Sequence, residues 1–383
     1  MSSNGTASPS IIYLGLDVHK ESIMIAVLPA TAAVPTHVER LANDAAKLRR
    51  YFQRLARDGV ELRACYEASG AGYVLQRAMR DWGYRCEVIA PSLIPTKPGV
   101  QRKYDKYDAV QLARLYRAGE LTPVRIPTDA EERVRDLVRC RETFQREILK
   151  SRHYLLKFLA RRGLVYREGT NWCRPHWDWL RQLASADTLH EEDAVVFSEY
   201  LALLEYKIAR REDLDHRIEA LALTPTLAPM VARLQCFRGV QVHVAMVLAT
   251  ELVDWRRFED PRQLMAYVGL VPSEDSSGDR RRLGAITKAG NRHCRHALVQ
   301  AAWSYRYRPN QSPQLTARQR GQPALVVAHA WKAQHRLHKL FTRLADRKRP
   351  QIAAVAVARE LVGFLWSVMQ TLDPMPSPSA AAT

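Results

Sequence analysis

Two apolar runs near the start of the chain are the feature that most constrains its fold. In "IIYLGLDVHKESIMIAVLP" (residues 11–29) a short polar break separates them, which is the pattern of two strands joined as a hairpin. A third strand is predicted near "THVERLA". The next segment, "DAAKLRRYFQRLARDG" (44–59), has apolar residues at helical spacing, an Asp near its start and a Gly at its end, so it is predicted to be a capped helix.

The alternation of strands and helices continues along the first third of the chain. "ELRACYEA" predicts a strand, "GYVLQRAMRDWG" a helix and "RCEVIAP" a further strand, with another helix from about residue 108. The order β-β-β-α-β-α-β describes a mixed sheet with flanking helices. We therefore expect an α/β domain over residues 11–125.

Beyond the turn signals in "LTPVRIPTDAEE" the texture of the sequence changes. Residues 129–164 and 190–222 contain few Gly or Pro and carry dense charge around spaced Leu, Ile and Val, as long helices do. The connector "NWCRPHWDWLRQL" between them is rich in Trp and is predicted to be irregular. Two long charged helices predict an antiparallel coiled-coil arm over residues 126–225, which often also serves as an oligomer contact; a plain helical spacer is the alternative.

The segment "TPTLAP" (224–229) ends the arm. Residues 226–370 are predicted to form a mostly helical C-terminal domain. The polar start (residues 1–10) and the end rich in Pro, Ser and Ala (371–383) are predicted to be disordered tails.

The charge of the chain indicates a polyanionic partner. Lys and Arg number 58 against 40 Asp and Glu, a formal net charge of +18, so nucleic acid is the first candidate. A membrane partner is not expected, because we find no hydrophobic span approaching the roughly 20 residues of a membrane helix. The basic residues predicted to contact phosphates are Arg280, Arg281, Arg282, Lys288, Arg292 and Arg295.

The six cysteines are scattered, form no CxxC pair and follow no secretion signal. Reduced thiols in a cytoplasmic protein are therefore expected.

Four carboxylates stand where elements of the predicted sheet can converge. Asp17 and Glu67 each end a predicted strand, and Asp105 and Asp108 lie at or just inside the start of the helix "DAVQLARLY". Gathered together they would repel one another unless a cation neutralised them, which predicts a hard divalent metal, Mg²⁺ or Mn²⁺, on oxygen ligands. For Asp105 a capping role at the helix start stays open.

These residues also carry a resemblance to a known family. "GLDVHK", "YEASG" and "KYDKYDAVQLARL" are similar, in order, to the D, E and DxxD motifs of the DEDD transposases of insertion sequences, described as bridge-RNA-guided serine recombinases. The resemblance implies a RuvC-like RNase H fold for the N-terminal domain. It also implies that Asp17, Glu67, Asp105 and Asp108 form the metal-binding, catalytic tetrad.

The resemblance extends to the C-terminal domain. "FEDPRQLMAYVGLVPSEDSSGDRRRLGAITKAGNRHCRHALVQAAW" is similar to the domain of that family that holds a serine nucleophile after a "GL.P" segment. The matching position here is Ser277, with Ser276 beside it as the alternative. The implied chemistry is attack by the hydroxyl on DNA and a covalent phosphoserine link.

The expected function is accordingly that of a DNA transposase and recombinase. Strand exchange at donor and target DNA implies a homodimer or homotetramer, and the family implies a structured guide RNA that pairs with both DNA sites. Two alternatives stay open. One is a metal-dependent Holliday-junction nuclease without a covalent intermediate, and the other is a basic nucleic-acid-binding protein whose RNase H-like domain is inactive.

Overall fold

A computed structural model describes residues 10–95, 105–185, 189–274 and 282–371. The chain divides into two compact units, residues 1–128 and 129–383. Each unit encloses its own hydrophobic core.

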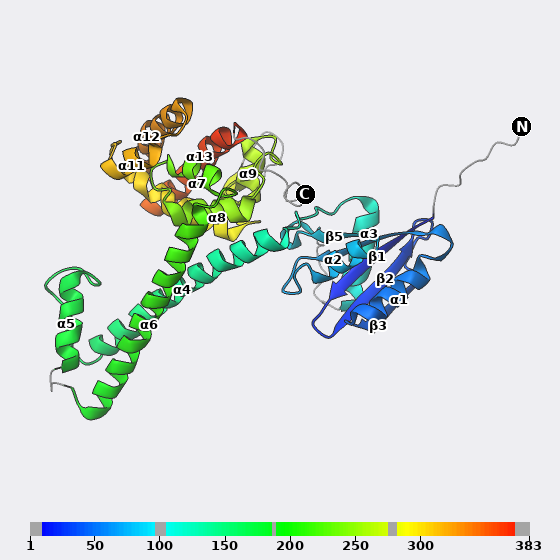
Figure 1. Ribbon diagram of the computed structural model, residues 1–383, viewed down its shortest axis with the longest axis horizontal. Coiled ribbons are helices and arrows are strands. Elements are labelled where there is room, and N and C mark those ends of the chain that lie inside the picture. The colour runs from blue at the N-terminus through cyan, green and yellow to red at the C-terminus, as the bar shows by residue number, and fades with distance from the viewer. Residues whose placement is uncertain (1–9, 96–104, 186–188, 275–281, 372–383) are drawn as a thin grey trace, which may run out of the picture. The chain divides into compact units, whose positions relative to one another are not determined.

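The elements of the N-terminal unit appear in the predicted order (Figure 1): β1 Ile11–Val18, β2 Ser22–Pro29, β3 His37–Ala42, α1 Ala45–Leu55, β4 Glu61–Glu67, α2 Val74–Asp81, β5 Arg85–Ile89 and α3 Asp105–Ala118. They form a five-stranded sheet of order β3-β2-β1-β4-β5. Strand β2 is antiparallel to both β1 and β3, whereas β1, β4 and β5 are parallel. The predicted mixed sheet with flanking helices is confirmed.

The two faces of this sheet carry different helices. Side chains alternate along a strand, so Leu14 and Leu16 point to one face, where they join Leu48 and Phe52 of α1 in the main core of the unit. Ala26 and Leu28 of β2 lie on the other face, packed with Ala109 and Ala113 of α3. Helix α3 therefore covers the face opposite α1.

The C-terminal unit is mostly helical, as predicted: α4 Asp129–Ala160, α5 Arg174–Ser185, α6 Glu191–Ala222, α7 Ala228–Gln235, α8 Val242–Leu252, α9 Pro261–Tyr267, β6 Pro272–Glu274, β7 Leu283–Ile286, α10 Arg292–Ala302, α11 Pro313–Gln319, α12 Ala324–Ala345 and α13 Pro350–Gln370. The antiparallel pair of short strands β6 and β7 was not predicted. It borders residues 275–281, which lie outside the described part of the chain.

Helices α4 and α6 pair along their length as an antiparallel arm (Figure 1). Arg141 of α4 pairs with Asp215 of α6 at 2.7 Å, and Arg162, past the end of α4, pairs with Asp193 in the first turn of α6. The later residue of the first helix pairs with the earlier residue of the second, so the two helices run in opposite directions. The predicted antiparallel pairing is confirmed, and its role as an oligomer contact stays a prediction.

The base of the arm belongs to the same core as the C-terminal helices. Val138 of α4 and Ile218 of α6 are buried with residues of α8, α10 and α13 in one hydrophobic cluster. The arm is therefore anchored by apolar packing at this end, rather than only linked through its loops.

The Trp-rich connector contains a helix, which corrects the prediction of an irregular segment. In α5 the side chains of His176, Leu180 and Leu183 are buried, and this spacing of four and three residues is helical. A proline in the first turn and three nearby tryptophans hid the pattern in the sequence. Leu180 and Leu183 belong to a hydrophobic cluster with residues of α4 and α6, and the rings of Trp172, Trp177 and Trp179 pack against that cluster.

Helix α13 corrects a second expectation. Its 21 residues have a mean hydropathy of 1.7 over their most apolar stretch, so by length and composition it could cross a membrane. The expectation that no such span exists was wrong. Half of that stretch is buried inside the protein, with Val357, Leu361 and Leu365 fully enclosed, so packing in the core accounts for its apolar composition.

Candidate active site

The first two predicted carboxylates end neighbouring strands. β1 and β4 are parallel, with Gly15 opposite Cys65 and Leu16 opposite Tyr66. Asp17 and Glu67 are the next residue on each strand, so they stand level at the carboxyl ends of the two strands. Because alternate residues share a face, both lie on the face of Gly15 and Cys65.

Helix α3 covers that face at close range. A methyl group on Gly15 would stand 2.1 Å from the carbonyl oxygen of Ala109, so the strand and helix backbones touch where Gly15 has no side chain. The thiol of Cys65 donates to the carbonyl oxygen of Leu112 at 3.7 Å. The helix that carries the DxxD motif is thus packed directly on the two strands that carry Asp17 and Glu67.

The direction of α3 brings its first turn toward the carboxylates. The ring of Tyr13 contacts that of Tyr116 near the end of the helix, at 5.9 Å between centroids, whereas Gly15 meets Ala109 near its beginning. The helix therefore runs opposite to β1, and Asp108 lies at the end of the face where β1 terminates. Asp105 is the first residue of the helix, and its side chain is outside the described part of the structure.

The three described carboxylates differ in exposure and in partners. The Asp17 side chain is 23% exposed, and its Oδ2 accepts a hydrogen bond from Nε2 of His19 at 3.0 Å. Glu67 is exposed and Asp108 is half-buried. The donors are hard carboxylate oxygens, as Mg²⁺ and Mn²⁺ require.

The described residues do not form a closed metal site. Among residues 10–95, 105–185, 189–274 and 282–371, no group of three or more His, Cys, Asp or Glu side chains is gathered closely enough to hold an ion. The backbone brings Asp17, Glu67 and Asp108 to one edge of one face, and the fourth predicted ligand, Asp105, has no described side chain. The tetrad therefore stays a prediction, supported by its placement.

The predicted nucleophile lies in the C-terminal unit. Ser277, its alternative Ser276, and the basic residues Arg280 and Arg281 all lie outside the described residues. The strands on either side are paired, Pro272 with Ile286 and Glu274 with Leu283. The roles predicted for Ser276, Ser277, Arg280 and Arg281 therefore stay predictions.

The remaining predicted basic residues have different surroundings. Arg282, Lys288 and Arg292 are exposed. The guanidinium of Arg295 donates to the carbonyl oxygens of Val268, at 2.8 Å, and Ala289, at 3.2 Å, and its burial lowers its pKa. Arg295 thus braces the backbone, and its contact with phosphate stays a prediction.

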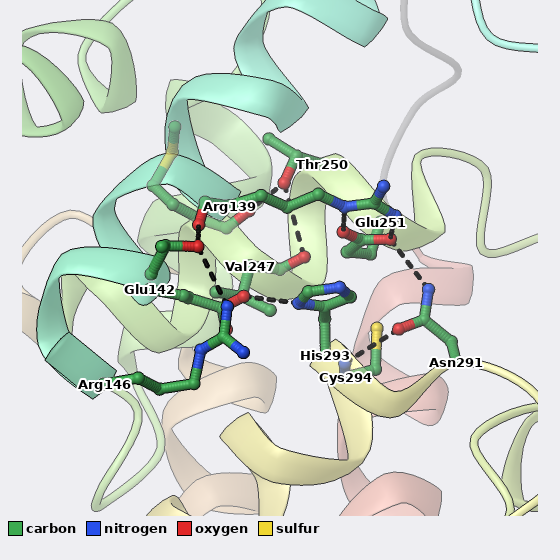
Figure 2. A network of polar contacts seen from close by, with 11 residues as sticks. Arg139, Glu142, Arg146, Val247, Thr250, Glu251, Asn291, His293 and Cys294 are labelled. Carbon is green, nitrogen blue, oxygen red and sulfur yellow. Dashed lines mark hydrogen bonds and ion pairs between the residues drawn. The ribbon is translucent and has the colours of Figure 1, made fainter. Parts of the chain in front are cut away.

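A buried polar network in the C-terminal unit was not predicted from the sequence (Figure 2). The guanidinium of Arg139 on α4 donates to both oxygens of Glu251 on α8, at 2.7 and 2.9 Å. Asn291 donates to Glu251 at 2.8 Å, and its own side-chain oxygen accepts from the backbone N–H of Cys294, capping α10. One carboxylate thereby joins the arm, α8 and the start of α10. The signal in the sequence was a lone acid in the apolar helix "VHVAMVLATEL".

The fold and the carboxylates together define a class of protein. A five-stranded sheet of order β3-β2-β1-β4-β5 with only β2 antiparallel to its neighbours is the RNase H-like arrangement. Asp17 and Glu67 end two neighbouring parallel strands of this sheet, and Asp108 lies on the helix that covers them.

Comparisons with known proteins give the family. A family model described as Transposase, DEDD_Tnp_IS110, matches residues 14–162, and the model Transposase IS116/IS110/IS902 family matches residues 231–317. The y4qE protein of Sinorhizobium fredii, whose name describes a transposase, is 37% identical over 359 residues, covering 93% of this chain and 88% of that protein. The transposase for insertion sequence element IS1533 of Leptospira borgpetersenii is 31% identical over 341 residues, covering 88% of this chain and 98% of that protein.

The chain belongs to the IS110/IS116 family of DEDD transposases. It is a DNA transposase, an enzyme of DNA cutting and rejoining, and a DEDD domain implies dependence on divalent metal ions in general.

Proposed function

We propose that this transposase acts on the DNA of an insertion sequence through the carboxylates of its N-terminal unit and a serine of its C-terminal unit. The observation that supports the proposal is the arrangement of three carboxylates. Asp17 and Glu67 stand at the carboxyl ends of β1 and β4, on the sheet face that α3 covers, and Asp108 lies in the first turn of α3 at the same end. Together with Asp105 they would hold Mg²⁺ or Mn²⁺, which when bound would neutralise charge on the scissile phosphate.

Ser277 is the proposed nucleophile, with Ser276 as the alternative. Its hydroxyl oxygen forms a bond to the DNA phosphorus while the bond from phosphorus to the leaving sugar oxygen breaks. A general base takes the hydroxyl proton, and the result is a phosphoserine ester that conserves the energy of the broken bond for rejoining. The cationic residues Arg280 to Arg282 stand beside it in the sequence and are suited to stabilise charge on that phosphate.

The partners follow from the same proposal. Two DNA sites need several nucleophiles, so the active form is a homodimer or homotetramer, with the α4–α6 arm as its joint. A structured RNA pairs with donor and target DNA, and the protein contacts that RNA mainly through backbone and shape. The net charge of +18 supports binding to these polyanions. The proposed location is the cytoplasm of a prokaryotic cell, where the protein would act on the nucleoid.

Recombination by paired serine variants tests the nucleophile. We expect Ser277→Ala to abolish recombination, with a loss of about a thousandfold or more because the attacking atom is gone. Ser276→Ala should retain activity, and Ser198→Ala on the arm is the control for a serine outside the site. Retained activity in Ser277→Ala with loss in Ser276→Ala would move the nucleophile by one residue.

Trapping the adduct separates the proposal from its alternatives. Protein incubated with cleavable DNA and Mg²⁺ is denatured and digested, and mass spectrometry locates any nucleotide bound to serine. A metal-dependent nuclease would cut DNA without such an adduct. An inactive binding protein would bind DNA with the same affinity after Asp17→Ala. Its unmutated form would show no Mg²⁺-dependent cutting or joining of DNA strands.

A further inference from the structure

A cavity of about 490 Å³ opens within the C-terminal unit, lined by α4, α6, α8, α10 and the segment after β7. Its volume lies in the range of small-ligand sites. The floor is apolar and comes from four helices, with Val138, Ile218, Val247 and Ala297 all buried. A hollow with such a floor suits a flat organic ring better than a bare phosphate.

The rim of this cavity is cationic. Lys288 and Arg292 are both exposed there, and no ion pair is found for either of them among the described residues. Arg141 is partly neutralised, since its guanidinium donates to Asp215 at 2.7 Å. The one acid of the lining, Glu142, is engaged by His293 of α10 (Figure 2).

The backbone presents Lys288 to the rim at a conformational cost. Lys288 has a φ of 55°, in the left-handed region, which side chains with a Cβ seldom adopt. Its N–H donates to the carbonyl oxygen of Gly269 at 3.1 Å. Nearby, a methyl group on Gly290 would stand 2.0 Å from the carbonyl oxygen of Tyr267. The loop is therefore held tightly, and such strain at a non-glycine residue is typical of binding sites.

We propose that this cavity binds a single unpaired nucleotide. The base enters the hollow above the apolar floor, and the ring of His293 and the exposed guanidinium of Arg146, which also line the cavity, are the groups available for stacking. The phosphates on either side of that nucleotide lie on Lys288 and Arg292 at the rim. A paired base keeps its faces inside the stack and cannot enter, so the site distinguishes a bulged or single-stranded nucleotide from a duplex. The inference rests on the proposed function only in taking nucleic acid as the ligand.

Binding to matched hairpins tests the site. Labelled hairpins of one stem sequence, with and without one unpaired nucleotide in the stem, are titrated in EDTA so that no strand chemistry occurs. DNA and RNA versions decide which nucleic acid supplies the nucleotide. We expect the wild type to prefer the bulged hairpin about tenfold, the order of one base stacked on a protein surface.

Charge removal at the rim should abolish that preference. The double variant Lys288→Ala/Arg292→Ala is expected to bind both hairpins alike. The slope of log affinity against log salt concentration should become shallower by about 1.4, because each neutralised phosphate on a single strand contributes roughly 0.7. The matched control Lys47→Ala/Arg49→Ala removes the same charges from exposed positions on α1 and should keep the preference.

A second variant tests the floor without changing charge. Val299→Phe narrows the cavity from its α10 side and should remove the preference for the bulge while binding to the paired stem is unchanged. Thermal melting confirms that it folds. The inference would be overturned if Lys288→Ala/Arg292→Ala kept the preference for the bulged hairpin. It would also be overturned if the control Lys47→Ala/Arg49→Ala lost that preference to the same extent.

The binding assay is independent of strand chemistry. A protein that recombines DNA but shows no bulge preference would refute the nucleotide site alone. A protein that shows the preference but forms no serine adduct would refute the proposed function alone.

Discussion

At the residue scale, Gly15 shows how one absent side chain positions a candidate site. Strand β1 can lie against α3 only because Gly15 has no Cβ, since any Cβ there would overlap the carbonyl oxygen of Ala109 and the backbone N of Ala113, at 2.1 and 2.5 Å. Both are backbone atoms of a helix and cannot rotate away. The distance of Asp108 from Asp17 therefore depends on a glycine that takes no part in the chemistry.

Replacing Gly15 by Ala should push α3 off the sheet. We expect the free energy of unfolding to fall by about 2–3 kcal/mol, as overpacking of a tight contact does. Recombination should be lost as well, because the proposed metal ligand Asp108 would move away from Asp17. Urea unfolding and a recombination assay measure both effects. Gly70→Ala is the matched control, because a Cβ there meets nothing within 4 Å; a Gly15→Ala protein as stable as that control would contradict the close packing.

Glu251 is the second residue on which local structure depends. Burial would raise its pKa, but the hydrogen bonds and charge of Arg139, helped by Asn291, outweigh burial and hold the pKa below the ordinary value of 4.5. A carboxyl whose pKa is lower in the folded than in the unfolded protein stabilises the fold above the unfolded value. That stabilisation is lost as the pH falls from 4.5 toward the folded pKa.

Glu251→Gln should therefore destabilise the protein in a pH-dependent way. We expect a cost of about 2 kcal/mol at pH 7, the order of a charge-assisted hydrogen bond, shrinking as the pH drops below 4.5 because only the wild type titrates. Urea unfolding across pH 3.5 to 7 measures it. The control Glu360→Gln breaks the exposed pair with Arg336 and should change stability by less than about 1 kcal/mol at any of these pH values. Equal losses of stability in the two variants would contradict a stabilising role for the network of Arg139, Glu251 and Asn291.

At the element scale, the far end of the arm has a small hydrophobic core of its own. This tip of the arm is built from the end of α4, the helix α5 and the start of α6. His176 is fully buried, stacked with Trp179 and edge-on to Trp172. Its Nδ1 accepts the backbone N–H of Trp172 at 3.1 Å, so the proton sits on Nε2, for which the described residues supply no partner. The ring is thus held neutral in an aromatic surrounding.

Acid should loosen the tip of the arm. Burial lowers the pKa of His176 below its ordinary value of 6.5. The unfolded tip then binds a proton that the folded tip does not, and its stability falls as the pH drops below 6.5. Hydrogen exchange of residues 166–183 should be faster at pH 5.5 than at pH 7.5, relative to the chemical rate at each pH.

The histidine can be removed to check this origin. His176→Phe should make the protection of the tip independent of pH, whereas His216→Phe, at an exposed position on α6, should leave the acid sensitivity in place. Unchanged sensitivity in His176→Phe would assign the effect to another group.

At the scale of the whole molecule, the two units have separate cores. Buried residues from Leu14 to Val88 form the main core of the first unit, and those from Val138 to Met369 form the core shared by the arm base and the C-terminal helices. Stability that comes from burial inside each unit does not require the other. A cut between Thr128 and Asp129 should therefore leave both parts folded.

Separate expression of residues 1–128 and 129–383 tests that expectation. Each fragment should give a cooperative thermal transition and dispersed amide signals in solution. A fragment 1–128 that stays unfolded would show that the sheet depends on the rest of the chain. Neither fragment alone should recombine DNA, since the proposed metal-binding carboxylates and the proposed nucleophilic serine lie on different fragments.

Much of the fold could be predicted because its signals are local. The alternation of apolar runs indicated the order of strands and helices in residues 11–120, and the Asp44 cap and the charged runs located α1 and the arm helices. Pattern reasoning failed where packing decides. Helix α5 was hidden by its tryptophans, and β6–β7 are too short to leave a pattern. The apolar span of α13 is a local property of composition and was missed all the same; only its burial in the core depends on the tertiary structure.

The carboxylates illustrate the same division. The sequence by itself determined which residue types stand at strand ends and at a helix start, because these follow from patterns a few residues long. Only the tertiary structure decided that Asp17, Glu67 and Asp108 share one face, since this depends on a parallel register between β1 and β4 and on the close contact at Gly15. The Arg139–Glu251–Asn291 lock and the cavity beside it join residues more than a hundred positions apart, and no local pattern records such contacts.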